Sequence, residues 1–267
     1  MNTPNYDLIG DTHGQYDKLA ALLRHLDYEP VGSTWKHPRG RKVIFLGDYV
    51  DRGPKIRAVL QTVRGMCDAG DALAIMGNHE YNAVCFATPD GQGGHLRQHN
   101  ERHTRSHRAT LEQFAHLQDE WNEWLDWMKR LPFALDLGGL RCVHACWDPR
   151  GLGVLEGKSL MDDAFLRTSA TKHTPEHQAI ETVLKGPEVP ATAGNMFRDK
   201  EGTYRSTVRT RWWDIRAGLN IGELAMPPGS LDDSCPLDEA RLQRLPNYGF
   251  DDPPVFCGHY WLPADSP

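Results

Sequence analysis

Residues 42–53 read KVIFLGDYVDRG, an apolar run that ends in glycine and is followed by two aspartates and an arginine. The run is apolar throughout residues 43–46 and partly β-branched, which is typical of a strand buried on both faces of a parallel sheet. Ligands bind outside the carboxyl ends of such strands, and glycine there permits a tight turn or close backbone approach. We therefore expect a buried strand over residues 42–46 that carries Asp48 to a binding crevice.

The same pattern recurs elsewhere in the chain. Three further apolar runs end in glycine followed by a side chain that can bind metal, namely Ile9-Gly10-Asp11, Met76-Gly77-Asn78 and Cys257-Gly258-His259. A fifth run ends in Val143-His144 without the glycine. His13 lies two residues after Asp11, and in extended backbone two such side chains point to the same side. Five strand ends would thus direct metal-binding side chains into one crevice.

The expected ligands are Asp11, His13, Asp48, Asn78, His144 and His259. All are oxygen or imidazole donors, which suit Mn, Fe, Zn or Ni better than calcium or a structural zinc site. Six ligands are more than one ion needs if positions stay open for water and substrate, so we predict two divalent ions bridged by a carboxylate. Two such ions, two aspartates and a bridging hydroxide leave a net charge of about +1, which favours phosphate esters as substrates.

In the first half of the chain, short apolar runs alternate with amphipathic segments, which is the pattern of βαβ units in an α/β protein. The sequence predicts strands at 6–9, 42–46, 72–76, 140–143 and 255–257, and helices at 15–27 and 56–66. Residues 148–254 are rich in glycine, proline and charge with little periodicity. We expect them to form loops and short elements around the site.

The composition excludes several classes of protein. The 267 residues are 39% hydrophobic and 25% charged, which is ordinary for a soluble globular chain. No apolar run approaches the roughly 18–20 residues of a membrane-spanning helix, and the first residues lack the pattern of a secretory signal, so we expect a cytoplasmic protein without a membrane partner. The net charge of −6 argues against extended binding to nucleic acid.

Residues 88–130 interrupt the alternation and are predicted to form a helical insertion or flap. A glycine-rich stretch leads into a polar segment in which His95, His99, His103 and His107 recur every four residues. On a helix these side chains form one stripe, for which a solvated helix or a flap beside the site is favoured over accessory metal binding. One long helix should follow, with an apolar stripe that packs in the core: Leu111, Phe114, Leu117, Trp121, Trp124, Leu125 and Met128.

Three motifs carry a resemblance to a known family: GDTHG at residues 10–14, GDYVDRG at 47–53 and GNHE at 77–80. In this order they resemble signatures of the calcineurin-like metallophosphoesterases, and within them of the phosphoprotein phosphatases. The motifs VHA at 143–145 and GH at 258–259 look like the two later histidines of that family. The resemblance implies an αββα sandwich that forms a single domain over residues 1–267, with 88–130 as a helical insertion within it.

The resemblance also implies roles for individual residues. Asp11, His13 and Asp48 would bind one metal, and Asp48, Asn78, His144 and His259 the other. His79 would be the general acid that protonates the leaving oxygen, oriented by Asp51, and Arg52 would hold a phosphate oxygen. These roles are chemically sensible, because a proton-donating imidazole needs a carboxylate partner and arginine offers two donors to phosphate. The family usually has a further phosphate-binding arginine, for which Arg209 and Arg211 are the candidates.

Motifs and resemblance together predict a dinuclear, metal-dependent phosphoric ester hydrolase in which metal-bound hydroxide attacks phosphorus. Manganese is the first choice of metal, with iron, zinc or nickel as alternatives. The first interpretation of the substrate is a phosphoprotein, cleaved by a protein-phosphatase-like phosphomonoesterase. The alternative is a dinucleoside polyphosphate of the diadenosine tetraphosphate type. An alternative from another class is a non-catalytic module that binds a phosphorylated ligand. The oligomeric state stays open.

The chain ends eight residues after His259, which is too few for another strand and its return. Members of the family that the chain resembles usually continue through further strands of the second sheet. We therefore expect the residues after Trp261 to form a poorly packed tail, and the last sheet to be reduced or completed by another chain.

Overall fold

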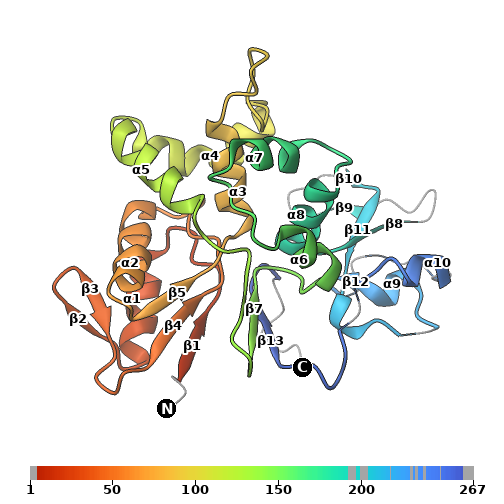
Figure 1. Ribbon diagram of the computed structural model, residues 1–267, viewed down its shortest axis with the longest axis horizontal. Helices are drawn as coiled ribbons and strands as arrows, with labels where there is room; N and C mark the ends of the chain where they lie inside the picture. Colours follow the sequence, from red (N-terminus) through yellow and green to blue (C-terminus); the bar gives the residue numbers. More distant parts are fainter. Residues whose placement is uncertain are drawn as a thin grey trace.

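The structure is a computed structural model that describes residues 5–191, 197–198, 204–216, 218–228, 231, 234–236, 239–246 and 248–260. Two sheets lie next to each other in the middle of the molecule, and helices cover their outer faces (Figure 1). The tail predicted for residues 262–267 lies outside the described residues.

The first sheet is parallel and has the order β1-β4-β5. Its strands are β1 (Tyr6–Ile9), β4 (Lys42–Phe45) and β5 (Ala72–Ala74). Two helices cover its outer face, α1 (Tyr16–His25) and α2 (Ile56–Asp68) (Figure 1). A small hairpin of β2 (Glu29–Val31) and β3 (Thr34–Lys36) follows α1. The strands and helices that the sequence predicts here are confirmed, with ends that differ by at most two residues.

The second sheet has the order β13-β7-β6. Its strands are β6 (Ala134–Asp136), β7 (Arg141–Val143) and β13 (Val255–Cys257), with β13 parallel and β6 antiparallel to β7. Three helices lie on its outer side, α6 (Pro149–Leu155), α7 (Asp163–Ala170) and α8 (Pro175–Lys185). Because β13 pairs directly with β7, residues 114 positions apart in the chain lie side by side in one sheet.

The two sheets pack on each other through a small apolar core. Ile44 of β4 and Cys142 of β7 are fully buried in it, and Leu8, Leu73 and Leu135 pack around them. Neighbouring residues such as Ile9 and Val43 point instead to the helix side, into the main core. This alternation is the expected consequence of the two-residue period of strands. The predicted αββα sandwich is thereby confirmed.

Residues 148–254, for which loops and short elements are predicted, form three helices over their first part, α6, α7 and α8. Each helix starts at a side chain that accepts hydrogen bonds from its first backbone N–H groups, namely Asp148, Asp162 and Thr174. Such N-caps define a helix start even where the apolar stripe is short. The glycines and prolines of this part therefore do not exclude helices, because proline is favoured in the first helical turn.

A third sheet lies beyond α8. Its order is β12-β11-β8, and the strands are β8 (Glu188–Pro190), β11 (Thr207–Thr210) and β12 (Ala225–Met226). The remaining described elements here are β9 (Phe197–Arg198), β10 (Tyr204–Arg205), η1 (Trp212–Asp214), α9 (Ile221–Leu224) and α10 (Glu239–Leu242). The fully buried indole of Trp212 donates to the carbonyl of Ala145 at 2.9 Å, which fixes this region to the end of β7.

The predicted insertion contains two helices where one long helix was expected. Following α3 (Asn78–Ala87), α4 spans Glu101–Phe114 and α5 spans Gln118–Met128. The Asn100 side chain accepts from the backbone of His103 and starts α4, so His95 and His99 precede the helix and the predicted four-membered stripe does not form. Trp121 and Trp124 are buried, which confirms that the tryptophans of this segment pack in the core.

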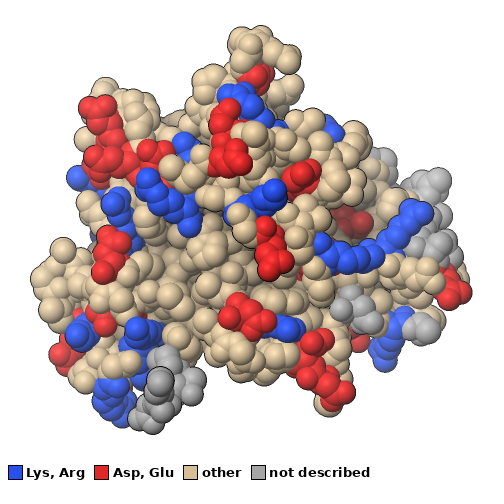
Figure 2. Space-filling model, in the orientation of Figure 1, with Lys and Arg blue, Asp and Glu red and all other residues tan. Residues whose placement is uncertain are grey.

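The surface in Figure 2 carries basic and acidic side chains interspersed, with a group of acidic ones at the upper left, where Figure 1 places α5. That helix begins with Asp119 and Glu120 in its first turn. Among the described helices, none combines the length and the apolar character needed to cross a membrane.

Leu22 and Leu23 are neighbours on α1 with opposite environments, because Leu22 is 39% exposed and Leu23 is fully buried. We predict that Leu23→Ala lowers the free energy of unfolding by about 2–5 kcal/mol, since it leaves a cavity in the core. Leu22→Ala removes the same atoms from an exposed site and should cost roughly 0.5 kcal/mol. Urea unfolding followed by circular dichroism measures both values. Similar losses in the two variants would contradict this orientation of α1.

Candidate metal centre

The six predicted metal ligands lie together at the carboxyl ends of β1, β4, β5, β7 and β13. Nε2 of His13 is 3.5 Å from Oδ2 of Asp48 and 4.0 Å from Oδ2 of Asp11. On the other side of Asp48, Oδ1 is 3.4 Å from Nε2 of His144, and that nitrogen is 3.0 Å from Oδ1 of Asn78. Asp48 thus lies between two sets of donor atoms.

Two groups of donor atoms meet the distance requirement for a shared ion, and both contain Asp48. One group is His13, Asp48 and His79, and the other is Asp48, His144 and His259, with all atoms of a group within 4.8 Å of one another. Asp11 joins them through its Oδ1, which accepts from the backbone N–H of His259 at 2.8 Å. The structure therefore brings every predicted ligand into one cluster.

The imidazoles are oriented as metal-binding histidines usually are. Nδ1 of His13 contacts the carbonyl of Val50 at 2.9 Å, and Nδ1 of His144 contacts the carbonyl of Leu46 at 2.6 Å. A carbonyl only accepts, so both rings carry their proton on Nδ1 and present Nε2 to the cluster. Nε2 of His13 and of His259 is buried and has no hydrogen-bond partner within the described residues. These atoms fit a pair of bound cations.

The backbone around Asp48 is as close-packed as the sequence predicted. Gly47 has φ +94°, and a Cβ atom there would lie 2.6 Å from Cα of Gly77. A Cβ atom on Gly77 would lie 2.3 Å from the backbone nitrogen of Asp48. Real atoms do not approach so closely, so both positions require glycine. Asp48 itself has φ +57°, a backbone conformation that residues other than Gly, Asn and Asp rarely adopt.

Glu80 holds this backbone in place, and sequence reasoning missed its role. Its Oε2 accepts from the N–H groups of Asp48 at 2.7 Å and Gly77 at 3.1 Å. Its Oε1 accepts from those of Tyr49 at 2.7 Å and Val50 at 3.1 Å. Burial and the charge of Asp48 raise the pKa of Glu80 to about 7, against the effect of the N–H donors. The available signal was the glutamate of the GNHE motif at residues 77–80, directly after His79.

The carboxylates and imidazoles of the cluster shift one another's pKa values. Burial alone would raise the pKa of Asp48, but the neighbouring His144 and His79 hold it well below its usual value. Burial alone would lower the pKa of His144, but Asp48, together with Asp11 and the carbonyl of Leu46, raises it to about 9. The pKa of His259 is well below its usual value because of burial and of the adjacent His144 and Arg209. The cluster is thus a buried polar site with strongly interacting charges.

His79 lies at the edge of this cluster. Its Nδ1 is 2.6 Å from Oδ2 of Asp51, and its Nε2 is 3.9 Å from Oδ2 of Asp48. Burial opposes protonation of the ring, but Asp48 and the hydrogen bond to Asp51 raise the pKa of His79 above its usual value. The predicted pair of His79 and Asp51 is therefore in contact, with the far nitrogen of the imidazole turned towards the cluster.

Asp51 has two further partners that sequence reasoning missed. Its Oδ1 is 2.7 Å from Nδ1 of His107 and accepts from the hydroxyl of Thr110 at 2.6 Å. Both residues belong to α4, where they are three positions apart and so share a face. The histidine repeat of the insertion was the signal, although the sequence favoured a solvated helix or a flap for it.

The three predicted phosphate-binding arginines differ in their positions. Arg52 follows Asp51, has φ +64° and is exposed, and its charge contributes to lowering the pKa of His13. The charge of Arg209 in β11 likewise contributes to lowering the pKa of His259. The Nε atom of Arg209 is buried without a hydrogen-bond partner in the described part of the chain. Arg211 instead pairs with Asp214 at 3.3 Å and donates to the carbonyl of Glu223. Arg52 and Arg209 are therefore beside the cluster, whereas Arg211 is bound elsewhere.

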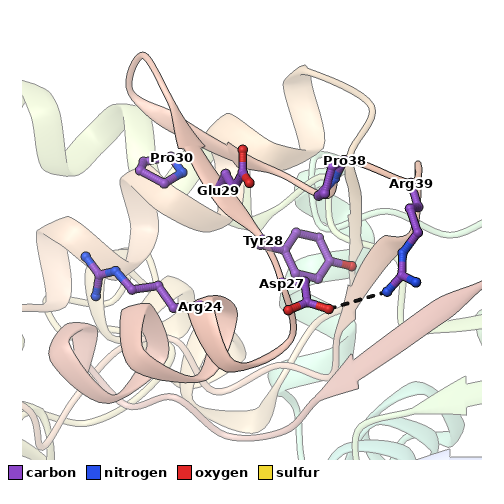
Figure 3. A pocket seen from close by; sticks show the side chains of 7 residues that line it. All are labelled: Arg24, Asp27, Tyr28, Glu29, Pro30, Pro38 and Arg39. Atoms are coloured by element: carbon purple, nitrogen blue, oxygen red, sulfur yellow. Dashed lines mark hydrogen bonds and ion pairs between the residues drawn. The ribbon is translucent and has the colours of Figure 1, made fainter.

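A separate surface hollow lies between the end of α1 and the β2–β3 hairpin (Figure 3). Its lining is Arg24, Asp27, Tyr28, Glu29, Pro30, Pro38 and Arg39. None of the predicted site residues belongs to it, and its charged side chains carry both signs, with Arg39 paired to Asp27 at 3.4 Å. The hollow offers no donor set comparable to that around Asp48.

Comparison with known proteins agrees with this geometry. The family description of calcineurin-like phosphoesterases matches residues 5–192. The asymmetrical bis(5'-nucleosyl)-tetraphosphatase PrpE of Halalkalibacterium halodurans is 42% identical over 74 residues, which cover 28% of this chain and 30% of that protein. The chain thus matches less than a third of the length of that relative.

Two longer matches are more distant in sequence. A symmetrical bis(5'-nucleosyl)-tetraphosphatase of Aromatoleum aromaticum is 24% identical over 262 residues, covering 94% of this chain and 81% of its own. That of Vibrio cholerae is 26% identical over 237 residues, covering 87% and 72%. The family description matches more than two thirds of the residues of this chain, and the motif residues gather in one cluster at the adjoining edges of the two sheets. This chain therefore belongs to the calcineurin-like phosphoesterases.

Proposed function

We propose that this protein is a metal-dependent hydrolase of dinucleoside polyphosphates. The observation that carries the proposal is the position of Asp48, whose two carboxylate oxygens face separate sets of nitrogen and oxygen donors. In this proposal Asp11, His13 and Asp48 bind one divalent cation, and Asp48, Asn78, His144 and His259 bind the other. Manganese is the first choice of metal, with iron, zinc or nickel as alternatives, since all donors are oxygen or imidazole nitrogen.

When bound, such ions supply Lewis acidity towards phosphoryl oxygens and lower the pKa of water. The protein's own contribution is to hold the substrate and to move one proton. Arg52 and Arg209 approach the cluster from different parts of the chain, and guanidinium groups bind phosphate oxygens through two N–H donors. The buried position of Asp48 strengthens these interactions, because a site with little water screens charge weakly.

His79 is proposed as the proton donor to the departing oxygen. The Asp51 carboxylate accepts from Nδ1–H of the ring, so the proton that can leave is on Nε2, the nitrogen turned towards Asp48. The raised pKa of His79 favours the protonated ring. His79 and Asp51 would thus form the catalytic pair implied by the family resemblance.

The relatives favour a nucleotide substrate over a phosphoprotein. The sequence interpretation put a phosphoprotein first and dinucleoside polyphosphates second, but the relatives reported above are all bis(5'-nucleosyl)-tetraphosphatases. A net charge of −6 with arginines gathered near the site also suits a small polyanion held by local charge. We also propose that the protein is located in the cytoplasm.

We predict that the manganese-loaded protein hydrolyses diadenosine tetraphosphate with a kcat/KM at least about ten-fold above that for a phosphopeptide, a nucleoside monophosphate or a cyclic nucleotide, because only the first extends a polyphosphate across both arginines. Chromatography of the products measures the rates. It also shows whether two diphosphates or a triphosphate and a monophosphate are formed. Faster turnover of the phosphopeptide would overturn this choice of substrate and support the protein-phosphatase interpretation.

The loss of His79 should matter most for a substrate with a basic leaving group. His79→Ala should lower kcat for phenyl phosphate by about 10²-fold or more, and much less for p-nitrophenyl phosphate, whose leaving group needs less protonation. Metal content, measured by mass spectrometry, should stay unchanged. An equal loss on both substrates would point instead to a role in binding or folding.

Arg209 and Arg211 should differ in their effect on KM. Arg209→Ala should raise KM for diadenosine tetraphosphate about ten- to hundred-fold, since it removes charged hydrogen bonds worth about 1.5–3 kcal/mol. Arg211→Ala breaks a contact with Asp214 and should leave KM close to that of the unchanged protein. Steady-state kinetics of the two variants decides the matter, and the reverse result would assign the phosphate to Arg211.

A further inference from the structure

We propose that His107 and Thr110 of the helical insertion are positioning residues for the catalytic pair, because they hold the Asp51 carboxylate in the orientation that receives His79. This inference rests on the proposed function of His79 as a proton donor. It assigns a role in the reaction to α4.

The contacts around Asp51 divide between its two oxygens. Oδ2 receives His79, whereas Oδ1 receives Nδ1 of His107 at 2.7 Å and the hydroxyl of Thr110 at 2.6 Å. The hydroxyl oxygen of Thr110 also accepts from the backbone N–H of Asp51 at 3.0 Å. Thr110 thus closes a ring with the side chain and the backbone of Asp51, which leaves the carboxylate little freedom to rotate.

The direction of these bonds follows from the chemistry of the groups. An ionised carboxylate only accepts, so both imidazoles must carry a proton on Nδ1, and the threonine hydroxyl must donate. Each donor occupies a lone-pair position that water would otherwise fill. With Oδ1 held by two donors from α4, only Oδ2 is turned to His79, and its ring is fixed with Nε2 towards the metal cluster.

The backbone of Asp51 explains why external support is needed. Asp51 and Arg52 have φ values of +69° and +64°, so two consecutive non-glycine residues occupy the left-handed region. Such conformations are strained and persist where surrounding contacts hold them. Gln113, three residues after Thr110 on the same face of α4, adds two bonds: its Oε1 accepts from Ile56 at 2.7 Å and its Nε2 donates to the carbonyl of Gly53 at 3.0 Å.

His107 is itself enclosed by aromatic side chains of the neighbouring helices. It is 5% exposed, with the ring of Phe86 from α3 at 5.2 Å and that of Trp121 from α5 at 6.0 Å between centroids. Three helices therefore fix the imidazole, and Thr110 beside it is fully buried. This buried imidazole donates its Nδ1–H to a carboxylate at the site, unlike a solvated histidine of a mobile flap.

The test compares variants of the whole protein, loaded with manganese, on phenyl phosphate and p-nitrophenyl phosphate. His107→Phe keeps an aromatic ring but removes the donor, and His107→Asn keeps an N–H group close to the position of Nδ1. We expect His107→Phe to lower kcat for phenyl phosphate about ten-fold more than kcat for p-nitrophenyl phosphate, with KM within about two-fold, because only proton donation is impaired. His107→Asn should restore most of this difference.

The matched control is His103→Phe, which changes the same residue type one turn earlier on α4, where Nδ1 contacts the carbonyl of Gln98. It should leave the ratio of the two kcat values unchanged. Thermal unfolding of each variant separates effects on stability from effects on the reaction. An equal loss on both substrates in His107→Phe, no loss at all, or an Asn variant that loses as much as the Phe variant would overturn the proposal.

A second readout keeps this test apart from that of the proposed function. The same assay on His79→Gln reports whether His79 donates a proton at all. NMR of the protein loaded with diamagnetic zinc in place of manganese reports the bond of His79 to Asp51 directly, through the low-field Nδ1–H resonance of His79. We expect that resonance to shift or exchange faster in His107→Phe and to persist in His103→Phe. An unchanged resonance in His107→Phe would contradict the positioning role, whatever the activity on either substrate.

Discussion

The site depends on a buried carboxylate, Glu80, which accepts hydrogen bonds from four backbone N–H groups of the two loops that follow β4 and β5. Together with the bonds from the N–H groups of His13 and Gly14 to the carbonyls of residues 48 and 49, they hold the left-handed turn of the loop 47–50, which directs Asp48 into the cluster. The two oxygens of Glu80 thus replace water and neighbouring strands as partners for backbone groups that burial leaves without solvent. The cluster around Asp48 is built on that support.

The pairing of strands in the two sheets also brings the residues of the cluster together. Parallel pairing of β1, β4 and β5 brings the loops with Asp11, Asp48 and Asn78 to one edge. Parallel pairing of β7 with β13 does the same for His144 and His259. The apolar contact between the sheets, through residues such as Ile44 and Cys142, then sets the two edges side by side. A polar cluster of this density requires rigid elements on all sides, because each unpartnered charge would be costly to bury.

The segment predicted as an insertion is joined to this centre by polar bonds from one face of α4. His107, Thr110 and Gln113 bind the segment that follows Asp48, and the aromatic rings of α3 and α5 hold His107 in turn. The support of Asp51 therefore comes from residues more than fifty positions later in the chain. In the sandwich the two sheet edges supply the expected metal ligands, whereas α4 supplies hydrogen-bond donors to the proposed catalytic pair.

The sequence by itself determined the strands, their glycine ends and the six donor residues, because each of these is local: an apolar run, a turn residue and a side chain beyond it. It could not determine that α4 starts at Asn100 and turns His107 towards Asp51, since the same histidine spacing also suits a solvated helix. Nor could it determine that Arg211 pairs with Asp214 and donates to the carbonyl of Glu223, contacts that Arg209 does not share. Only the tertiary structure decided these points, because they depend on which distant donor meets which buried acceptor, and no local pattern encodes that pairing.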